Sequence, residues 1–125
     1  MSNLLSVVII ANNEEKFIQD AIKSAQFADE VLLLDSGSID KTCEIAKKLG
    51  ARVENQVWLG FGPQKNRAVD LAANDWVFVL DSDERISSKL QSEIITTLNN
   101  PSCDGYSVAR LNNFFGKDIR TCGLY

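Results

Sequence analysis

Histidine is absent from the 125 residues of this chain. Its absence excludes Ser-His and Cys-His nucleophile pairs, histidine metal ligands and the most common general base. Any chemistry must therefore rest on carboxylates, on lysine or arginine, and on a bound metal.

Cysteine and long apolar runs are also scarce. Cys43, Cys103 and Cys122 are odd in number and widely spaced, which predicts neither a disulfide framework nor a zinc site and favours a reducing cytoplasm. No apolar run approaches the roughly 18 residues that span a bilayer. The first residues, Met1 to Leu5, lack a basic segment followed by a long apolar one. We expect a soluble, cytoplasmic chain without a transmembrane segment.

Positive charge is not in excess: 13 Lys and Arg stand against 17 Asp and Glu, a net charge of −4. This balance offers no electrostatic footprint for nucleic acid or for an anionic membrane. The length suits one domain with a real core. We expect a single domain over residues 1–125 and no nucleic-acid partner.

Apolar runs of strand length alternate with stretches in which apolar residues recur every three or four positions. The runs predict strands at 6–10, 30–35, 52–58 and 76–81. The first two helices are expected to begin at about 13 and at about 39. A loop at 60–63 should precede a third helix from 64 to about 73. The fourth helix is expected to begin at 87 or 88, capped by Ser87 or Ser88, and to end at about 100. The alternation predicts an α/β fold: a mostly parallel open sheet with helices on both faces. The helix residues expected to face the sheet are Phe17, Ile18, Ala21, Ile22, Ala25, Ile39, Cys43, Ala46, Leu49, Ala68, Leu71, Ala72, Leu90, Ile94 and Leu98.

The pattern changes after Asp104. Residues 105–111 alternate like an exposed strand, and residues 112–117 suggest a turn or loop. Nothing after Phe115 has the pattern of a finished core element. We therefore expect the chain to be a piece of a longer protein.

The segment from Trp76 to Glu84 is the most informative in the chain. An apolar run ends abruptly in Asp81, Asp83 and Glu84, as expected of a buried strand that delivers acids to a ligand at its carboxyl end. Two carboxylates this close repel one another unless a cation or a shared proton offsets their charge. Hard oxygen ligands suit Mg²⁺ or Mn²⁺ carrying substrate phosphates, although Asp and Ser also end strands simply as turn formers and helix caps.

Polar groups follow three of the expected strands at one edge of the sheet: Asn12 to Glu14, Asp35 to Ser38, and Asp81 to Asp83. Parallel strands bring them into one crevice. There Asp35 can accept hydrogen bonds from a pyrimidine imide or from ribose hydroxyls, while a metal at the last group neutralises a diphosphate. Together they predict a nucleotide diphosphate site. Taken singly, Asp35 is equally well explained as a turn former, and Asn13 or Glu14 is more often a helix cap than a ligand contact.

In this order, the segments 7–15, 31–42, 64–68 and 80–84 resemble the GT-A nucleotide-sugar glycosyltransferases of family two. The Asp-x-Asp at 81–83 is common in turns, so the resemblance rests on the ordered set over residues 6–85. The variants Ala-Asn-Asn-Glu-Glu and Asp-Ser-Gly-Ser are similar to the bacterial branch that adds sugars to the lipopolysaccharide core.

The resemblance implies a Rossmann-like GT-A fold and a role for each matching residue. A nucleotide-diphosphate sugar, usually UDP-linked, would bind through Ala11, Asn13, Glu14, Asp35, Lys65, Asn66 and Asp81. Of these residues, Asp35 would contact the base, and Lys65 and Asn66 would lie near the phosphates or the ribose. Asp81 and Asp83 would hold Mg²⁺ or Mn²⁺, with Asp83 as the principal ligand. Lys65 is equally well explained as part of a solvated helix face.

In the reaction that the resemblance implies, an acceptor hydroxyl displaces the nucleoside diphosphate with inversion. The acceptor would be a saccharide or lipid-linked saccharide of the lipopolysaccharide core type. The general base is expected beyond Tyr125, so this chain is expected to retain donor and metal binding without efficient transfer. The full-length form is expected in the cytoplasm, with peripheral association at the inner membrane.

Two alternatives stay open at this point. The chain could be a non-catalytic nucleotide-binding fragment, or one that forms a homodimer through surface that its missing half should cover. Haloacid dehalogenase-type phosphatases also place Asp-x-Asp after an apolar strand. Their motif, however, lies on the first strand and usually has Thr or Val where this chain has Arg85.

Overall fold

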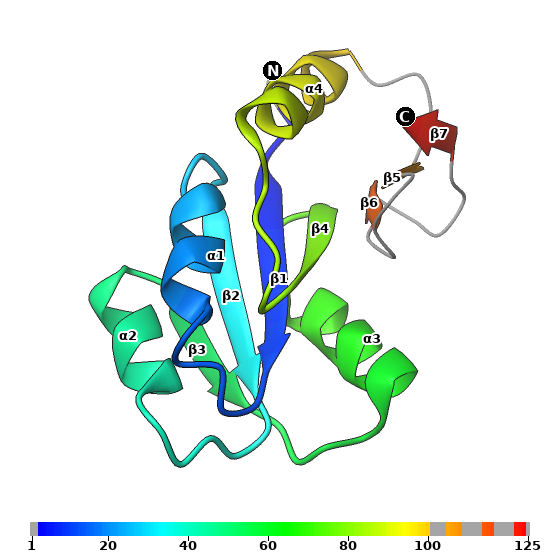
Figure 1. Cartoon of the computed structure of the whole chain (residues 1–125). Coiled ribbons are helices and arrows are strands. Elements are labelled where there is room, and N and C mark those ends of the chain that lie inside the picture. The colour runs from blue at the N-terminus through cyan, green and yellow to red at the C-terminus, as the bar shows by residue number, and fades with distance from the viewer. Residues whose placement is uncertain (1–2, 101–104, 109–113, 117–121, 125) are drawn as a thin grey trace.

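The computed structural model describes residues 3–100, 105–108, 114–116 and 122–124, with side chains described over residues 3–100. Strands and helices alternate up to residue 99, as the sequence predicts (Figure 1). The elements are β1 (Leu5–Ala11), α1 (Ile18–Ser24), β2 (Glu30–Asp35), α2 (Thr42–Lys48), β3 (Arg52–Asn55), α3 (Phe61–Leu71), β4 (Trp76–Asp81), α4 (Ser88–Asn99), β5 (Gly105–Val108), β6 (Phe114–Gly116) and β7 (Cys122–Leu124).

The strands form one sheet in the order β3-β2-β1-β4-β6-β5-β7. Strands β1 to β4 are mutually parallel, and β6 adds to β4 in antiparallel fashion. The carboxyl ends of β1 to β4 therefore meet at one edge, which lies at the bottom of Figure 1. This topology confirms the predicted, mostly parallel α/β sheet.

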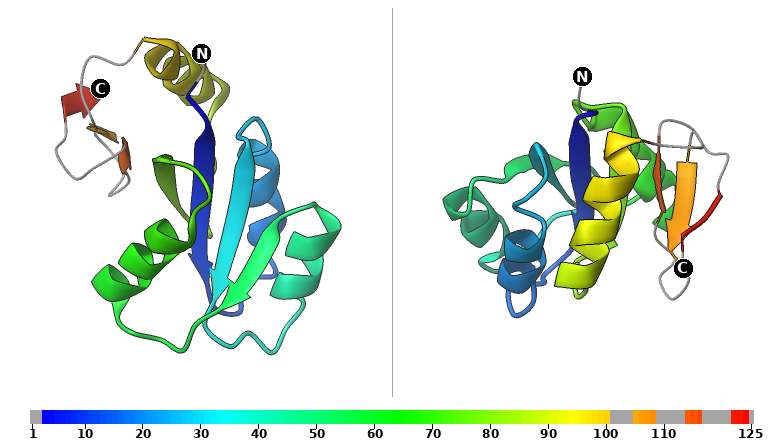
Figure 2. Two further views of the ribbon diagram at one scale, coloured as in Figure 1. Left: turned by 180° about the vertical axis from the view of Figure 1, so that it is seen from behind. Right: turned by 90° about the horizontal axis from the view of Figure 1, so that it is seen from above.

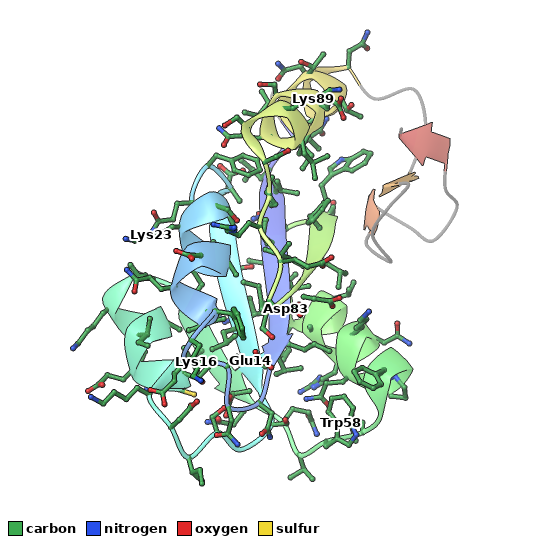
Figure 3. All side chains as sticks on the ribbon, in the orientation of Figure 1. Glu14, Lys16, Lys23, Trp58, Asp83 and Lys89 are labelled. Carbon is green, nitrogen blue, oxygen red and sulfur yellow. The ribbon has the colours of Figure 1, made fainter. Side chains whose placement is uncertain are left out.

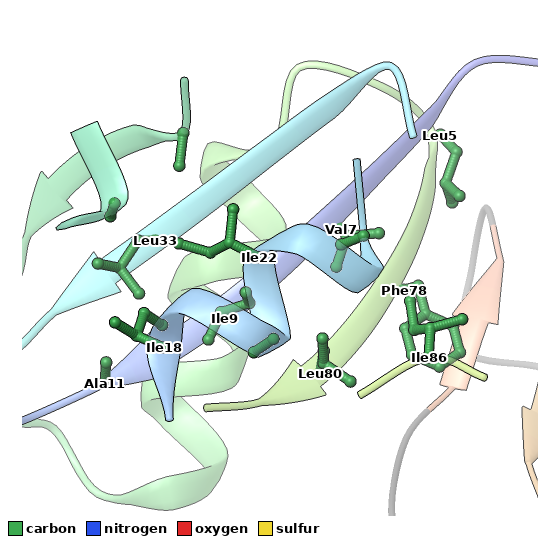
Figure 4. Packing of buried hydrophobic residues seen from close by; sticks show 14 of the residues in the cluster. Leu5, Val7, Ile9, Ala11, Ile18, Ile22, Leu33, Phe78, Leu80 and Ile86 are labelled. Atoms are coloured by element: carbon green, nitrogen blue, oxygen red, sulfur yellow. The ribbon is translucent and has the colours of Figure 1, made fainter. Parts of the chain in front are cut away.

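Helices cover both faces of the sheet (Figure 2). Alternate residues of β1 point to opposite faces: Val7 and Ile9 pack with α1, α2 and α4, whereas Val8 and Ile10 pack with α3. Figure 4 shows the first of these clusters, in which Ile18 and Ile22 of α1 lie over β1. Burial on both faces explains why the strands read as continuous apolar runs.

Helix α1 begins at Ile18 and not near residue 13, so the expected helix start at Asn12–Glu15 is wrong. Asn13 has a φ of 54°, which a helix cannot accommodate. The backbone N–H groups of Asn13 and Glu14 donate to side chains of the loop after β2. Phe17 consequently precedes the helix and is 52% exposed instead of facing the sheet.

The loops on either side of β3 differ from the expectation as well. Helix α2 begins at Thr42, so Ile39 lies before it and is 94% exposed. Strand β3 ends at Asn55, and Val57 is 81% exposed because the chain has left the sheet. Helix α3 begins at Phe61, so part of the expected loop is helical and Pro63 lies in the first turn, where a missing N–H costs nothing.

The last described elements confirm some expectations and correct others. The Ser87 hydroxyl accepts a hydrogen bond from the Leu90 N–H, the predicted cap of α4. The loop expected at 112–117 is wrong for residues 114–116, which form β6 and pair with β4. Strand β7 pairs with β5 and was not predicted, because three residues carry too little alternation. The rest of the expected strand and loop, at 109–113 and 117, falls outside the described residues.

Over the described ranges, none of the helices combines the length and apolar character that a membrane crossing requires.

Candidate functional site

A cavity of about 750 Å³ opens at the carboxyl edge of the parallel strands. It receives residues from the ends of β1, β2 and β4 and from the segment that leads into α3. The lining residues are Ile10, Ala11, Asn12, Glu14, Ser36, Trp58, Phe61, Lys65, Asp81, Ser82 and Asp83. Figure 3 shows Glu14 and Asp83 at this edge, with Trp58 near the start of α3.

The two carboxylates expected to hold a metal both line this cavity. Asp81 ends β4, and its backbone N–H donates to Glu84 Oε1 at 3.1 Å. The Glu84 N–H in turn donates to the Asp81 carbonyl at 3.0 Å. This tight turn leaves the Asp81 side chain 40% exposed and Asp83 exposed. The turn thus holds the two carboxylates at the cavity surface, where they are accessible to a ligand.

Helix α3 brings one cation to the same place. Lys65 Nζ lies 3.8 Å from Asp81 Oδ1, and the lysine side chain is 25% exposed. The neighbouring Asn66 is exposed and is not among the described residues that line the cavity. The structure therefore brings Lys65 to the expected phosphate end of the site but leaves Asn66 outside it.

The end of β1 contributes Ala11, which is buried, and Glu14, which is partly buried; both line the cavity. Asn13 does not, as far as the described residues form it. Its backbone N–H donates to Ser38 Oγ at 2.7 Å, and its Oδ1 accepts from the Ile39 N–H at 2.8 Å. Asn13 thus joins the β1–α1 loop to the β2–α2 loop.

Asp35 is 2% exposed and builds the turn that follows β2. Its carboxylate accepts hydrogen bonds from the Gly37 N–H at 2.9 Å, the Ser38 N–H at 2.7 Å and the Ser38 hydroxyl. Burial, together with this carboxylate, raises the pKa of the Cys43 thiol. In this geometry Asp35 is outside the described lining of the cavity, and the adjacent Ser36 faces it.

A second set of bonds fixes the two loops to one another. Thr42 Oγ1 accepts from the Glu14 N–H at 2.8 Å, and Asp40 Oδ2 accepts from the Glu15 N–H at 3.2 Å. Partial burial raises the pKa of Asp40, but hydrogen bonds from Thr42 and Glu15 outweigh it and hold this pKa below its usual range. The Asp-Ser-Gly-Ser-Ile-Asp-Lys-Thr segment therefore serves largely to hold the loop after β1.

Sequence reasoning placed Asn12 and Ser36 at this edge of the sheet but missed the aromatic residues that line the cavity. Asn12 donates through Nδ2 to Ser36 Oγ at 2.9 Å, so these two polar side chains form one corner of the cavity. Trp58 and Phe61, on either side of Leu59 and Gly60, line the cavity as well. The signal that could have found them is two aromatic residues flanking a glycine just before an expected helix.

The chemistry of the acids fits a hard divalent cation. Within the described part of the chain, no group of three or more His, Cys, Asp or Glu residues is arranged to hold a metal by itself. Mg²⁺ characteristically binds through one or two carboxylates and completes its shell with water and substrate phosphates. Asp81 and Asp83 in an open cavity match that pattern.

An acid-lined cavity beyond the carboxyl ends of the parallel strands is the place where open α/β sheets bind their ligands. Residues 6–121 match the family described as Glycosyl transferase family 2. The chain belongs to glycosyltransferase family 2. The expected resemblance is confirmed, and the phosphatase alternative loses its basis because the motif lies on β4 of a glycosyltransferase domain.

Similar protein sequences are also described as glycosyltransferases. An uncharacterized glycosyltransferase of Rickettsia bellii is 44% identical over 95 residues, which are 75% of this chain and 32% of the relative. The lipopolysaccharide core biosynthesis glycosyltransferase LpsC of Rhizobium meliloti is 32% identical over 113 residues, 85% of this chain and 42% of LpsC. The chain thus spans about a third of the first relative and under half of the second.

Solved structures confirm the GT-A fold. Residues 1–349 of S. aureus TarS superpose with a TM-score of 0.72 at 25% identity, covering 84% of this chain and 35% of TarS. Glucosyl-3-phosphoglycerate synthase of Mycobacterium tuberculosis, in complex with Mn²⁺, UDP and glucosyl-3-phosphoglycerate, gives 0.69 at 27% identity over 85% of this chain and 43% of the synthase.

Proposed function

We propose that this chain is the donor-binding part of a nucleotide-sugar glycosyltransferase and that its cavity binds a nucleoside diphosphate with Mg²⁺ or Mn²⁺. One observation carries the proposal: Asp81, Asp83 and Lys65 line the same cavity at the carboxyl edge of the parallel strands. Carboxylates repel a diphosphate unless a cation lies between them. The lysine adds a positive charge beside them.

The charge and position of each residue suggest which part of the ligand it would contact. Asp83 and Asp81 would bind the cation, and Lys65 on α3, whose Nζ lies 3.8 Å from Asp81 Oδ1, would turn toward a diphosphate oxygen. When bound, a divalent cation supplies Lewis acid stabilisation to the leaving diphosphate. Ala11 and Glu14 would border the nucleoside, while Asn13 and Asp35 would shape the two loops that enclose it.

We extend the proposal to UDP as the nucleotide and to a saccharide of the lipopolysaccharide core type as the acceptor. The synthase complex with UDP and Mn²⁺ supports the first, and the similarity to LpsC supports the second. The general base is proposed to lie outside the described residues. Glu84 is adjacent to the acids, but its carboxylate accepts the Asp81 N–H and is held in the turn.

The test is calorimetric titration of the folded chain with UDP, with and without Mn²⁺. Asp83→Asn should abolish the metal-dependent part of binding and Asp81→Asn should weaken it at least about tenfold, since each removes a charged ligand. Asp70→Asn is the matched control, because Asp70 is an exposed acid on α3 outside the cavity lining. Binding that needs no metal, or that survives Asp83→Asn, contradicts the proposal.

A further inference from the structure

Two large aromatic side chains line the cavity and remain exposed. Trp58 is 47% exposed and Phe61 is 73% exposed. Their ring centroids lie 5.0 Å apart with an interplanar angle of 90°, an edge-to-face pair. Both residues border the same cavity as the acids. The cavity therefore combines an exposed aromatic surface with charged groups.

The segment that carries Trp58 is fixed before any ligand arrives. Gln64 is fully buried; its Oε1 accepts from the Leu59 N–H at 3.1 Å, and its Nε2 donates to the Gln56 carbonyl at 3.3 Å. The Gln56 N–H donates to the Asp35 carbonyl at 2.9 Å. Gly60, with a φ of 102°, then turns the chain into α3. The ring is thus presented by a braced segment, which reduces the entropy lost on binding.

The aromatic pair and the acids lie toward opposite ends of the cavity. Trp58 follows β3, and Asp81 ends β4, with β2 and β1 between these strands in the sheet. Phe61 and Lys65 are four residues apart on α3, so they share a face and are separated by about 6 Å along the helix axis. Because Lys65 contacts Asp81, it marks the phosphate end. The aromatic residues therefore lie beyond the phosphates, on the side of β2 and β3.

From this arrangement we propose that Trp58 and Phe61 form an aromatic wall against which the donor's nucleobase stacks, Trp58 offering the larger face. The assignment rests on the proposed function, since it needs a nucleotide in the cavity. The base is the flat aromatic ring of a nucleotide sugar, and stacking on an aromatic side chain tolerates any base. Specificity for the base would then come from hydrogen bonds to its edge, for which Asn12 and Ser36 are polar side chains in the same cavity.

The test compares two ligands that share the phosphates and differ in the base: UDP and inorganic pyrophosphate, each titrated with Mg²⁺. Trp58→Ala should weaken UDP binding about tenfold and leave pyrophosphate binding unchanged, with Trp58→Phe retaining most of the affinity. Phe61→Leu should have a smaller effect of the same kind. Val57→Ala is the control, because Val57 is 81% exposed beside Trp58 and is not among the described lining residues.

Tryptophan fluorescence gives an independent readout. The chain has 2 tryptophans, and Trp76 is only 2% exposed, so a change on UDP addition reports on Trp58. We expect quenching by UDP and little effect of pyrophosphate. Phe61→Leu, which keeps both tryptophans, is the second variant in case Trp58→Ala misfolds, and it should reduce the UDP affinity.

Several outcomes overturn the inference. If UDP binding depends on metal but is unaffected by Trp58→Ala and Phe61→Leu, the aromatic wall is contradicted and the proposed function is not. Equal losses for UDP and pyrophosphate also contradict the wall, because the effect is then on the fold or the phosphates. A loss of binding to anionic phospholipid vesicles with unchanged UDP affinity would assign Trp58 to a membrane contact instead. A folded wild type that binds neither ligand overturns the proposed function and the wall together.

Discussion

Lys65 Nζ lies 3.8 Å from Asp81 Oδ1 and joins helix α3 to the end of β4 inside the cavity. The two side chains are 25% and 40% exposed, so water screens the pair and its own contribution to stability is small. The functional consequence is greater. Without a ligand the ammonium group offsets the carboxylate charge that would attract a cation, and with a diphosphate present it can turn to the anion.

Substituting this lysine should therefore have opposite effects on two ligands. Lys65→Met should strengthen binding of Mn²⁺ alone by up to about fivefold, because an exposed pair of this kind is worth about 0.2–1 kcal/mol. The same change should weaken binding of UDP with Mn²⁺, because the diphosphate loses a cation. Electron paramagnetic resonance of free Mn²⁺ and calorimetry of UDP measure the two quantities.

The control for this pair is Lys89→Met, since Lys89 lies on α4, away from the cavity (Figure 3). It should change neither affinity. A Lys65→Met variant that weakens both ligands would mean that Lys65 helps to build the site and does not compete with the cation.

Asn13 should be required for stability through its conformation and its carbonyl. It has a φ of 54° and accepts the Ile39 N–H at 2.8 Å. Asn13→Ala should lower the free energy of unfolding by about 1–2 kcal/mol, chiefly because it forces alanine into the left-handed region; the lost hydrogen bond adds less, since the Ile39 N–H is exposed to water. Urea denaturation measures the change. Asn13→Gly relieves the strain but not the lost bond, so a glycine variant as unstable as alanine would contradict the conformational part.

Sequence reasoning was strongest where burial alone decides the structure. Ile9 and Leu33 lie in apolar runs that can only be covered strands, and Ile94 recurs at helical spacing, so these elements were predicted correctly. It failed where long-range polar contacts decide. Asn13 looks like a helix start in the local sequence, but its N–H pairs with Ser38 across the loop, which no local rule contains.

The same distinction separates the site residues that the sequence predicts from those that it does not. Asp81 and Asp83 were placed at the edge because a strand carries them there, and the structure brings both to the cavity. Trp58 was not predicted as a site residue, because the expected strand at 52–58 included it, whereas β3 ends at Asn55. The sequence could not say either that Asp35 turns its oxygens toward the Gly37 and Ser38 N–H groups.

Glu30 should make stability depend on pH at the other edge of the sheet. Partial burial opposes its ionisation, but bonds from the Ala73 N–H, the Ser6 hydroxyl and the Arg52 guanidinium hold its pKa below the usual 4.5. A carboxyl whose pKa is lower in the folded state stabilises the fold above the unfolded pKa. That contribution is lost as the pH falls below 4.5 through the folded pKa.

Glu30→Gln should therefore lower the free energy of unfolding by about 1–3 kcal/mol at pH 7, because it weakens a charged hydrogen-bonding group. The variant should also lose less stability than the wild type between neutral and acid pH. Urea denaturation across this range measures both effects, with Glu93→Gln on α4 as the control. Parallel pH profiles for wild type and Glu30→Gln would contradict the assignment.

The most direct test of the central claim, that Asp81 and Asp83 hold a cation together with a nucleoside diphosphate, is a crystal structure with Mn²⁺ and UDP and an anomalous difference map at the manganese edge. The account predicts a single strong peak at coordination distance from an Asp83 carboxylate oxygen, bridged to the diphosphate and adjacent to Asp81. A peak elsewhere, or UDP bound in the cavity with no metal beside these acids, would contradict it.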